Sequence, residues 1–160
     1  MSERPAPPIL GELRQKRPFA SKAEEAVVTL FRTTDVIRRA GEAVVAPHGI
    51  SAQQYNVLRI LRGAGRKGLQ TLEIAERLVE RAPGITRLVD ALEKKKLVER
   101  ERCVEDRRVV WCRITKAGLA LLATLDAPVT AHAERTMRKL SAADLNKLTA
   151  ILDDIRIASA

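Results

Sequence analysis

Residues 85–100 read ITRLVDALEKKKLVER, and this stretch decides the fold. Its apolar side chains recur at the three- and four-residue spacing of an amphipathic helix: Ile85, Leu88, Val89 and Leu92. Pro83 fits the first turn of that helix, where its missing N–H costs nothing. The lysines 94–96 suit the negative end of the helix dipole, and we interpret them as a solvated helix end that adds to the electrostatic field; a direct contact with DNA is the alternative.

Two extended segments after this helix predict a β-hairpin. Leu97–Cys103 is the first, and Val109–Ile114 is the second, in which side chains alternate between two faces. The charged turn 104–108 joins the two segments and makes the tip basic, flanked by acids. We expect Cys103 and Cys112 to face each other across this hairpin.

Helices are predicted on both sides of this segment. A long helix of roughly 22–46 follows an arm, residues 1–20, that holds four of the seven prolines. Two short helices come next, and two more follow the hairpin. Their expected N-caps are Ser21, Ser51, Thr71, Thr115 and Ser141, and the first two of these lie within a capping box.

The chain is basic, and its excess charge is concentrated in the middle. The 160 residues include 29 Lys and Arg against 20 Asp and Glu, a net charge of +9. Residues 51–115 hold fifteen of the basic and nine of the acidic side chains, which is +6 of the +9. This concentration predicts a central nucleic-acid-binding module, and a solvated, slightly basic surface is the alternative.

Composition argues against several classes of protein. No apolar run approaches the roughly 18 residues of a membrane span, and residues 1–5 lack the apolar segment of a secretory signal. Aromatic residues, at 2% of the chain, are too few for gripping single strands by base stacking. Two cysteines favour a reducing cytoplasm. Without a nucleophile arrangement, a carboxylate pair or zinc-like spacing, we expect no enzyme, no metal and no cofactor.

The order of elements, a long helix, two short helices, the helix of about 83–96, a hairpin and further helices, is that of a winged helix-turn-helix. This fold is mainly α (α+β). The major groove of B-DNA admits one α-helix, which a second helix holds against the backbone. The predicted recognition helix covers about 83–96, and the wing, 103–109, carries a cationic tip that can reach the minor groove. We therefore expect residues 51–115 to bind double-stranded DNA.

Two blocks of this domain occur at a characteristic spacing: Ile85–Arg100, and Glu105–Arg108 followed by Ile114–Gly118. The first resembles the recognition helix and first wing strand of the MarR family of bacterial transcription regulators. The second is similar to that family's wing signature and the start of its next helix. The resemblance covers roughly residues 51–125.

The resemblance implies a homodimer. Its dimerisation region would be formed by the flanking N- and C-terminal helices, within residues 21–48 and 116–160. It also implies a pseudo-palindromic operator and a ligand-responsive regulator, which we expect to be a repressor. A small, often aromatic, effector would reduce its affinity for DNA. Such a regulator would be cytoplasmic and associated with the bacterial nucleoid.

The recognition helix supplies the first candidate DNA contacts. Thr86 and Arg87 lie off its apolar face, and the guanidinium of Arg87 suits bidentate bonding to guanine. The preceding residues, Ala82, Pro83 and Gly84, depart from the polar or basic side chains of many family members. We therefore predict that Pro83 and Gly84 belong to a contact between the backbone at the helix N-terminus and a phosphate of the DNA. Specificity would then depend on Arg87, the wing and DNA shape.

The wing and two helix starts supply the remaining candidates. In the family pattern, Asp106 orients the hairpin by ion pairing while Arg108, with Arg107 close behind, reaches the DNA. Backbone amides and short side chains at helix starts often meet phosphate, and the residues at these two starts are Ser51, Gln53, Gln70 and Thr71.

Two regulatory sites are also considered. A ligand pocket is expected where the predicted dimer arm meets the DNA-binding domain, and its candidate residues are Phe31, Arg38, His48 and Tyr55. The alternative makes Phe31 and Tyr55 core residues. Cys103 and Cys112 form a candidate redox pair, because neighbouring arginines can lower a thiol pKa, and ordinary strand residues are the alternative.

Two other functions remain open. A general, weakly specific nucleic-acid or nucleoid-binding protein would follow from the +9 charge and from the small side chains of Ala82 and Gly84. A cysteine-based redox sensor on the same scaffold would follow from Cys103 and Cys112.

Overall fold

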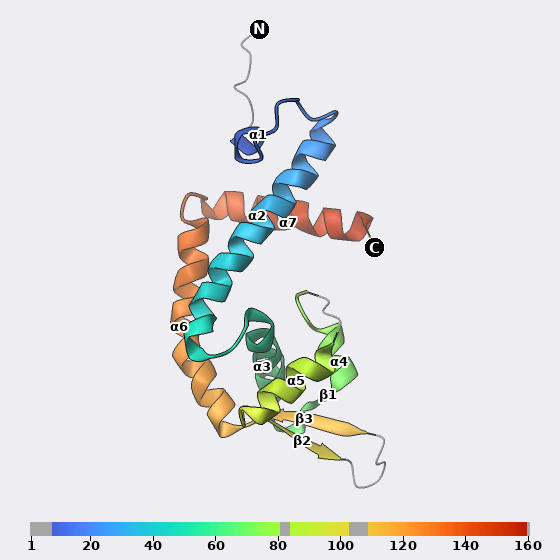
Figure 1. The fold of residues 1–160 in the computed structure, drawn as a ribbon, viewed down its shortest axis with the longest axis vertical. Coiled ribbons are helices and arrows are strands. Elements are labelled where there is room, and N and C mark those ends of the chain that lie inside the picture. The colour runs from blue at the N-terminus through green and yellow to red at the C-terminus, as the bar shows by residue number, and fades with distance from the viewer. Residues whose placement is uncertain (1–7, 81–83, 103–108, 160) are drawn as a thin grey trace. The chain divides into compact units, whose positions relative to one another are not determined.

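The structure is a computed structural model that describes residues 8–80, 84–102 and 109–159 (Figure 1). The chain forms two compact units, residues 1–40 and residues 41–160. We refer to them as the N-terminal unit and the C-terminal unit. Helix α2 (Lys22–Val45) is continuous from one unit into the other. No helix within the described ranges is both long and apolar enough to cross a membrane.

The N-terminal unit consists of a short helix and most of α2. Helix α1 (Pro8–Glu12) precedes an irregular segment, and α2 then begins where the sequence predicts. The Ser21 hydroxyl accepts from the Glu24 amide at 3.1 Å, as the capping box requires. The Glu24 carboxylate accepts from the Ala20 amide at 2.7 Å rather than from the cap residue itself.

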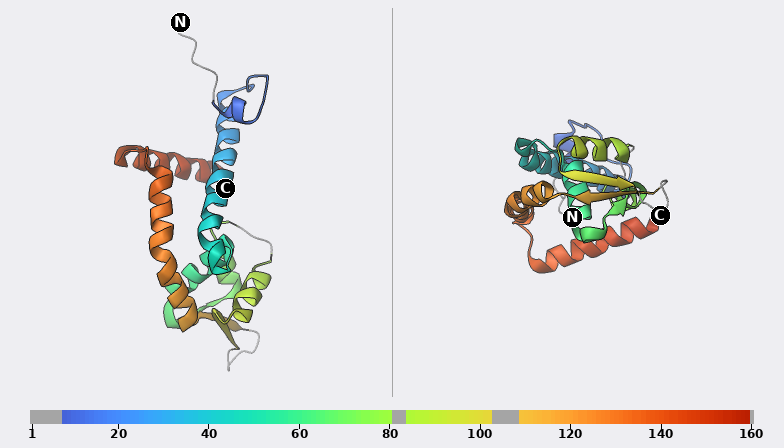
Figure 2. Two further views of the ribbon diagram at one scale, coloured as in Figure 1. Left: turned by 60° about the vertical axis from the view of Figure 1, so that its left-hand side comes forward. Right: turned by 90° about the horizontal axis from the view of Figure 1, so that it is seen from below.

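The C-terminal unit contains the winged helix-turn-helix and the C-terminal helices. Its elements in chain order are η1 (Ala46–His48), α3 (Ala52–Ala64), η2 (Gly65–Lys67), β1 (Leu69–Gln70), α4 (Thr71–Glu76), α5 (Ile85–Lys94), β2 (Val98–Arg102), β3 (Val110–Ile114), α6 (Lys116–Met137) and α7 (Ala142–Ala158). Helices α3, α4 and α5 pack against one another beside the hairpin (Figure 1). Helix α6 leads away from the hairpin, and the chain turns sharply into α7 (Figure 2). The predicted mainly α (α+β) class is confirmed.

A three-stranded antiparallel sheet has the order β1-β3-β2. The hairpin β2–β3 is the predicted one, whereas the two-residue strand β1 was not expected. Cys112 lies opposite Arg100 on one side and Leu69 on the other. The expectation that Cys103 and Cys112 face each other is therefore wrong, because the register of the strands places Arg100 and Leu69 beside Cys112; Cys103 itself lies outside the described residues.

One apolar core holds the C-terminal unit together. Its fully buried side chains come from every layer: Val57, Leu58 and Leu61 of α3, Ile74 of α4, Val89 and Leu92 of α5, Cys112 of β3, and Leu122 and Leu125 of α6. Val45, the last residue of α2, joins them. Burying a Leu or Val side chain contributes about 1.5–3 kcal/mol, so this cluster fixes α5 against α3 and α6.

Several helix starts agree with the sequence, and two do not. Ser51, Thr115 and Ser141 are N-caps, each accepting from the amide three residues on. Gln70, rather than Thr71, is the N-cap of α4. Helix α5 begins at Ile85, after its N-cap Gly84, rather than at about residue 83; Pro83 itself lies outside the described residues.

Two glycines allow backbones to pass closely at the hairpin. A Cβ on Gly68, whose φ is +72°, would lie 2.5 Å from the Cys112 carbonyl oxygen. A Cβ on Gly118 would lie 2.4 Å from the Leu97 carbonyl oxygen. Since real Cβ atoms do not approach backbone so closely, these positions set how tightly η2 and α6 approach the sheet.

Candidate nucleic-acid interface

Helix α5 presents one apolar face to the core and one polar face to solvent. Val89 and Leu92 are fully buried, and Ile85 and Leu88 pack against the same cluster. Thr86 and the nearby Arg87 are exposed, as predicted. The helix therefore has the form a groove-binding helix needs, with its anchoring and contacting faces separated.

The N-terminal end of α5 has no side-chain cap. Gly84 is the N-cap, in a left-handed conformation with φ +98°. Its carbonyl accepts from the amides of Arg87 at 2.9 Å and Leu88 at 3.3 Å. The amides of the first helical residues, Ile85 and Thr86, have no acceptor within the helix, which is the arrangement that binds anions. Pro83 lies outside the described residues.

Arg100 on strand β2 binds the acidic side chains of the recognition helix α5. The Arg100 guanidinium pairs with the Asp90 carboxylate and lies 3.6 Å from a Glu93 oxygen. It also reaches the Thr86 carbonyl at 3.5 Å. Because Arg100 contacts both acids of α5, its positive charge offsets part of the negative charge of this helix beside Arg87.

The sequence analysis did not identify Arg100, although its contacts hold α5 against strand β2. The available signal was the two-residue alternation of side chains along a strand, which places Arg100 on the same face of β2 as Val98, and Val98 is buried.

The other face of the hairpin holds a separate group of contacts. Arg113 pairs with the carboxylate of Glu101, which lies opposite Trp111 in the hairpin, and the Arg113 Nε donates to the Arg66 carbonyl at 2.9 Å. The Lys67 ammonium lies 6.0 Å from the centre of the Trp111 ring. These contacts attach the 3-10 turn η2 to the sheet, so the charge of Arg113 is used within the fold.

The candidate residues at the two helix starts act first as structural groups. The Ser51 hydroxyl accepts from the Gln54 amide at 3.2 Å. The Gln70 amide donates to the Glu73 carboxylate at 2.9 Å. The Thr71 hydroxyl lies 3.7 Å from the Cys112 sulfur. Gln53 is half-buried on α3. The DNA contacts of these four candidates stay predictions.

The wing tip includes Asp106, Arg107 and Arg108, all of which lie outside the described residues. Strands β2 and β3 lead to it from either side, at Arg102 and Val110. The assigned roles of the three tip residues stay predictions.

Cys112 is a fully buried strand residue. Burial raises the pKa of its thiol, and the hydrogen bond with Thr71 acts in the opposite direction. Since the thiolate is the reactive form, a raised pKa disfavours reaction with oxidants at neutral pH. The structure therefore places Cys112 as a core residue.

The candidates for a ligand pocket are divided between the two units. Tyr55 packs against the core of the C-terminal unit, with the Arg59 guanidinium 5.9 Å from its ring centre. His48 is exposed in η1. In the N-terminal unit Phe31 is 72% exposed, so its assignment as a core residue of this chain is wrong. A cavity of about 350 Å³ in this unit is lined by other residues: Leu10, Pro18, Phe19, Ala20, Ser21, Lys22 and Glu25.

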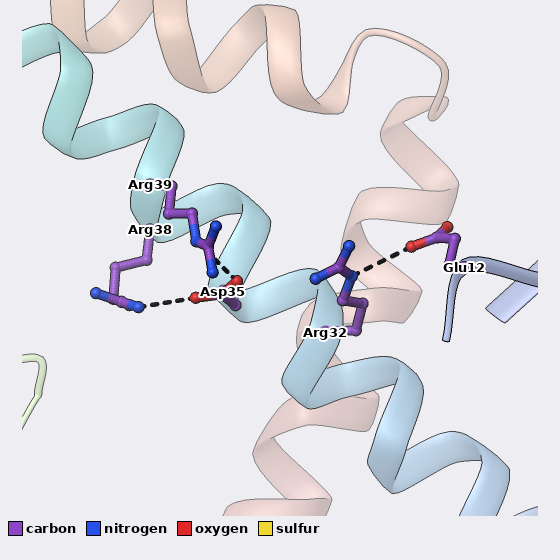
Figure 3. A network of polar contacts seen from close by, with 5 residues as sticks. All are labelled: Glu12, Arg32, Asp35, Arg38 and Arg39. Carbon is purple, nitrogen blue, oxygen red and sulfur yellow. Dashed lines mark hydrogen bonds and ion pairs between the residues drawn. The ribbon is translucent and has the colours of Figure 1, made fainter. Parts of the chain in front are cut away.

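Arg38, the remaining pocket candidate, belongs to an ion-pair network on α2 (Figure 3). Its guanidinium lies 2.8 Å from Asp35, whose other oxygen lies 2.9 Å from Arg39. The hydrogen bond from Arg39, and then that from Arg38, holds the pKa of the Asp35 carboxyl below its usual range. Arg32 pairs with Glu12 at 3.3 Å and so joins α2 to the end of α1. Arg38 is thus engaged with its own helix.

Comparisons with known proteins agree with this geometry. The family model described as "MarR family" matches residues 50–110. The HTH-type transcriptional regulator MhqR of Bacillus subtilis (strain 168) is 30% identical over 105 residues, which cover 66% of this chain and 71% of MhqR. The crystal structure of a MarR transcription factor from Planctomyces limnophilus is 42% identical, with a TM-score of 0.67, and the match covers 85% of this chain and 98% of that one.

The same fold is found in a DNA complex. A mutant MarR from E. coli complexed with operator DNA superposes with a TM-score of 0.77 at 21% identity, over 87% of this chain and 99% of that one. A winged helix-turn-helix with these relatives defines a DNA-binding transcription regulator. The chain belongs to the MarR family.

Proposed function

We propose that this regulator binds a pseudo-palindromic operator as a homodimer, with α5 in the major groove and the wing, 103–109, at the minor groove. The observation that carries the proposal is the polar face of α5, where Thr86 and Arg87 are exposed beside uncapped backbone amides. The charge supports it, because +6 of the net charge lies in residues 51–115. Phosphate contacts would supply affinity, and Arg87 with the wing would supply base preference.

Exposed apolar side chains support the homodimer. In the N-terminal unit, Val27 and Phe31 lie one helical turn apart on α2 and are 52% and 72% exposed. In the C-terminal unit, none of the 17 residues of α7 is buried, and Ile151 and Ile155 are 47% and 44% exposed. A helix without a buried face gains little stability in isolation, so we infer that a second copy covers these side chains.

Light scattering tests the assembly. The homodimer predicts a mass of about 35 kDa, twice the 17.7 kDa of one chain. A mass of one chain at micromolar concentration would contradict it. In such a dimer, two recognition helices would meet half-sites about 34–36 Å apart, one turn of the DNA.

A repressor that responds to a small aromatic effector is the further part of the proposal. Such a dimer would repress a gene whose promoter overlaps the operator, because it would exclude polymerase. The nucleoid would then be where the protein acts. Support for the effector is the family membership, and the candidate pocket residues Phe31, Arg38, His48 and Tyr55 remain predictions for mutagenesis.

Selection from random DNA tests sequence-specific binding. The wild-type protein is used to enrich duplexes from a random pool, and the enriched duplex is compared with a scrambled duplex of equal length and composition. The proposal expects one motif with two-fold symmetry and an affinity ratio of about 10³ or more between the two duplexes. Enrichment of no motif would refute it.

A general nucleic-acid-binding protein is the second candidate function. The observation that favours it is Gly84, which leaves the start of α5 without a side chain that can read a base. It predicts equal affinities for the enriched and scrambled duplexes, together with a steep dependence on salt. The same selection experiment therefore separates the two functions.

A further inference from the structure

A polar cluster joins three helices at the C-terminal end of the recognition helix. We call it the α5 anchor and define it by four residues: Glu42, Gly49, Gln54 and Lys95. Lys95 directly follows α5, and its ammonium donates to the Gly49 carbonyl and, at 3.3 Å, to the Gln54 side-chain oxygen. The interpretation of Lys95 as a solvated helix end is therefore incomplete, because its charge is bound to the turn before α3.

Gln54 is the central residue of the α5 anchor. It is 8% exposed, and its side-chain oxygen also accepts from the Ser51 amide at 3.2 Å. One amide oxygen thus receives a donor from the cap of α3 and a donor from the end of α5. A buried carbonyl oxygen with both lone pairs engaged fixes the two donors relative to each other.

The same turn of α3 is also bonded to α2. The Glu42 carboxylate, near the end of α2, accepts from the amide of Ala52, the first residue of α3, at 2.8 Å. Three helices therefore meet at one helix start. Lys95 is the member that extends this connection to the recognition helix.

Lys95 lies at the opposite end of α5 from the DNA-contacting residues, so a small tilt of the helix at Lys95 displaces those residues. From Lys95 to Thr86 is nine residues, or about 13 Å along a helix. A tilt of α5 by about 5° around its C-terminal end would move Thr86 by about 1 Å. Hydrogen bonds to base edges weaken steeply with such a shift, whereas contacts to phosphate through long side chains adjust.

We propose that Lys95 is a positioning residue for sequence reading, which sets the angle of α5 through Gln54 and Gly49 and does not itself bind DNA. This inference rests on the proposed function of α5 as the recognition helix. It assigns Lys95 to specificity and leaves general affinity to the other basic residues. Arg100 holds α5 at Asp90 independently, so α5 stays folded and docked without Lys95.

The test compares Lys95→Met with the matched control Lys94→Met. Both remove one positive charge from the same helix end. Binding is measured with the enriched duplex and the scrambled duplex described above, over a series of salt concentrations. We expect Lys95→Met to lower the ratio of the two affinities about tenfold, which is the fold-change that corresponds to the free energy of one charged hydrogen bond. Lys94→Met should leave that ratio within about twofold of wild type.

Three further outcomes decide the role of Lys95. A fall by about one in the slope of log affinity against log salt for Lys95→Met alone would show a direct phosphate contact and overturn the proposal. An equal affinity ratio for the two variants would also overturn it. Lys95→Arg, which keeps a long cationic donor, should restore most of the ratio, and failure of this rescue would count against the geometry.

A second variant keeps the test decisive if Lys95→Met does not fold. Gln54→Met leaves the lysine charge in place and removes its acceptor on α3. We expect a loss of affinity ratio that is no larger than that of Lys95→Met, because the bond from Lys95 to Gly49 remains, and a double variant no worse than Lys95→Met alone, because Gln54 acts on α5 only through Lys95. Additive losses would overturn the proposal. If wild type enriches no motif at all, the proposed function has failed, and this outcome is distinct from any difference between variants.

Discussion

Lys96 occupies a backbone conformation that favours glycine. Its φ is +59°, and it follows α5 at the position where a helix reverses into the next segment. The Leu97 amide donates to the Leu92 carbonyl at 3.0 Å, and the Lys96 amide donates to the backbone carbonyl of Glu93 at 2.8 Å. These two bonds define a Schellman motif, whose left-handed residue is most often glycine.

The expected difference in the free energy of unfolding follows from comparing two substitutions at this position. Lys96→Gly and Lys96→Ala lose the same charge, so they differ mainly in the cost of the left-handed conformation. That cost is roughly 1–2 kcal/mol for a residue with a Cβ, and glycine's extra freedom in the unfolded chain offsets about 0.4–1 kcal/mol of it. Lys96→Gly should therefore be more stable than Lys96→Ala by about 0.5–1 kcal/mol.

Lys94 provides the matched control. It is the last residue of α5 and has an ordinary helical position, where glycine is less stable than alanine by up to about 1 kcal/mol. The glycine variant should therefore be the more stable of the two at position 96, and the alanine variant the more stable of the two at position 94. Urea denaturation followed by circular dichroism, at one fixed protein concentration, measures all four variants. Alanine equal to or more stable than glycine at 96 would refute the reasoning.

Three further predictions concern the wing, the hairpin and the assembly. Arg100→Met should lower the free energy of unfolding by about 1 kcal/mol and weaken binding to the enriched duplex. In gel shifts, this loss of binding should become smaller at high salt. A loss of binding that is independent of salt would contradict the role of Arg100 in offsetting the acidic charge of α5. Gly118→Ala should destabilise by about 1–3 kcal/mol, because its Cβ would meet the Leu97 carbonyl, whereas Gly63→Ala, with open space around it, should not destabilise in the same thermal melts. Phe31→Glu should give a single-chain mass by light scattering, and an unchanged dimer would show that this side chain lies outside the interface.

Local sequence signals predicted most of the elements. The Ser51–Gln54 capping box and the Thr115 and Ser141 caps are local, since the bonds join residues three apart. The apolar spacing of α5 correctly identified which residues are buried and which, like Arg87, are exposed. These features depend on helix geometry alone, and one sequence is enough to show them.

Contacts between distant residues were not predictable in this way. The strand β1 has two residues, too few for an alternating pattern, and it exists because β3 pairs with it. Register was assumed to bring Cys103 to Cys112, but Arg100 lies there instead, and an error in register changes which side chains face each other. The bonds from Lys95 to Gly49 and Gln54 join residues 46 and 41 positions apart, and no sequence spacing indicates them.

Thr115 connects the hairpin, the end of the recognition helix and the start of α6. Its hydroxyl donates to the Lys96 carbonyl at 2.8 Å and accepts from the Gly118 amide at 3.1 Å, while its own amide donates to the Leu97 carbonyl at 3.1 Å. Three bonds through one residue leave no flexible linker between the wing and the C-terminal helix. The start of α6 must therefore move with the hairpin as one rigid piece, and inserting residues beside Thr115 would uncouple the two.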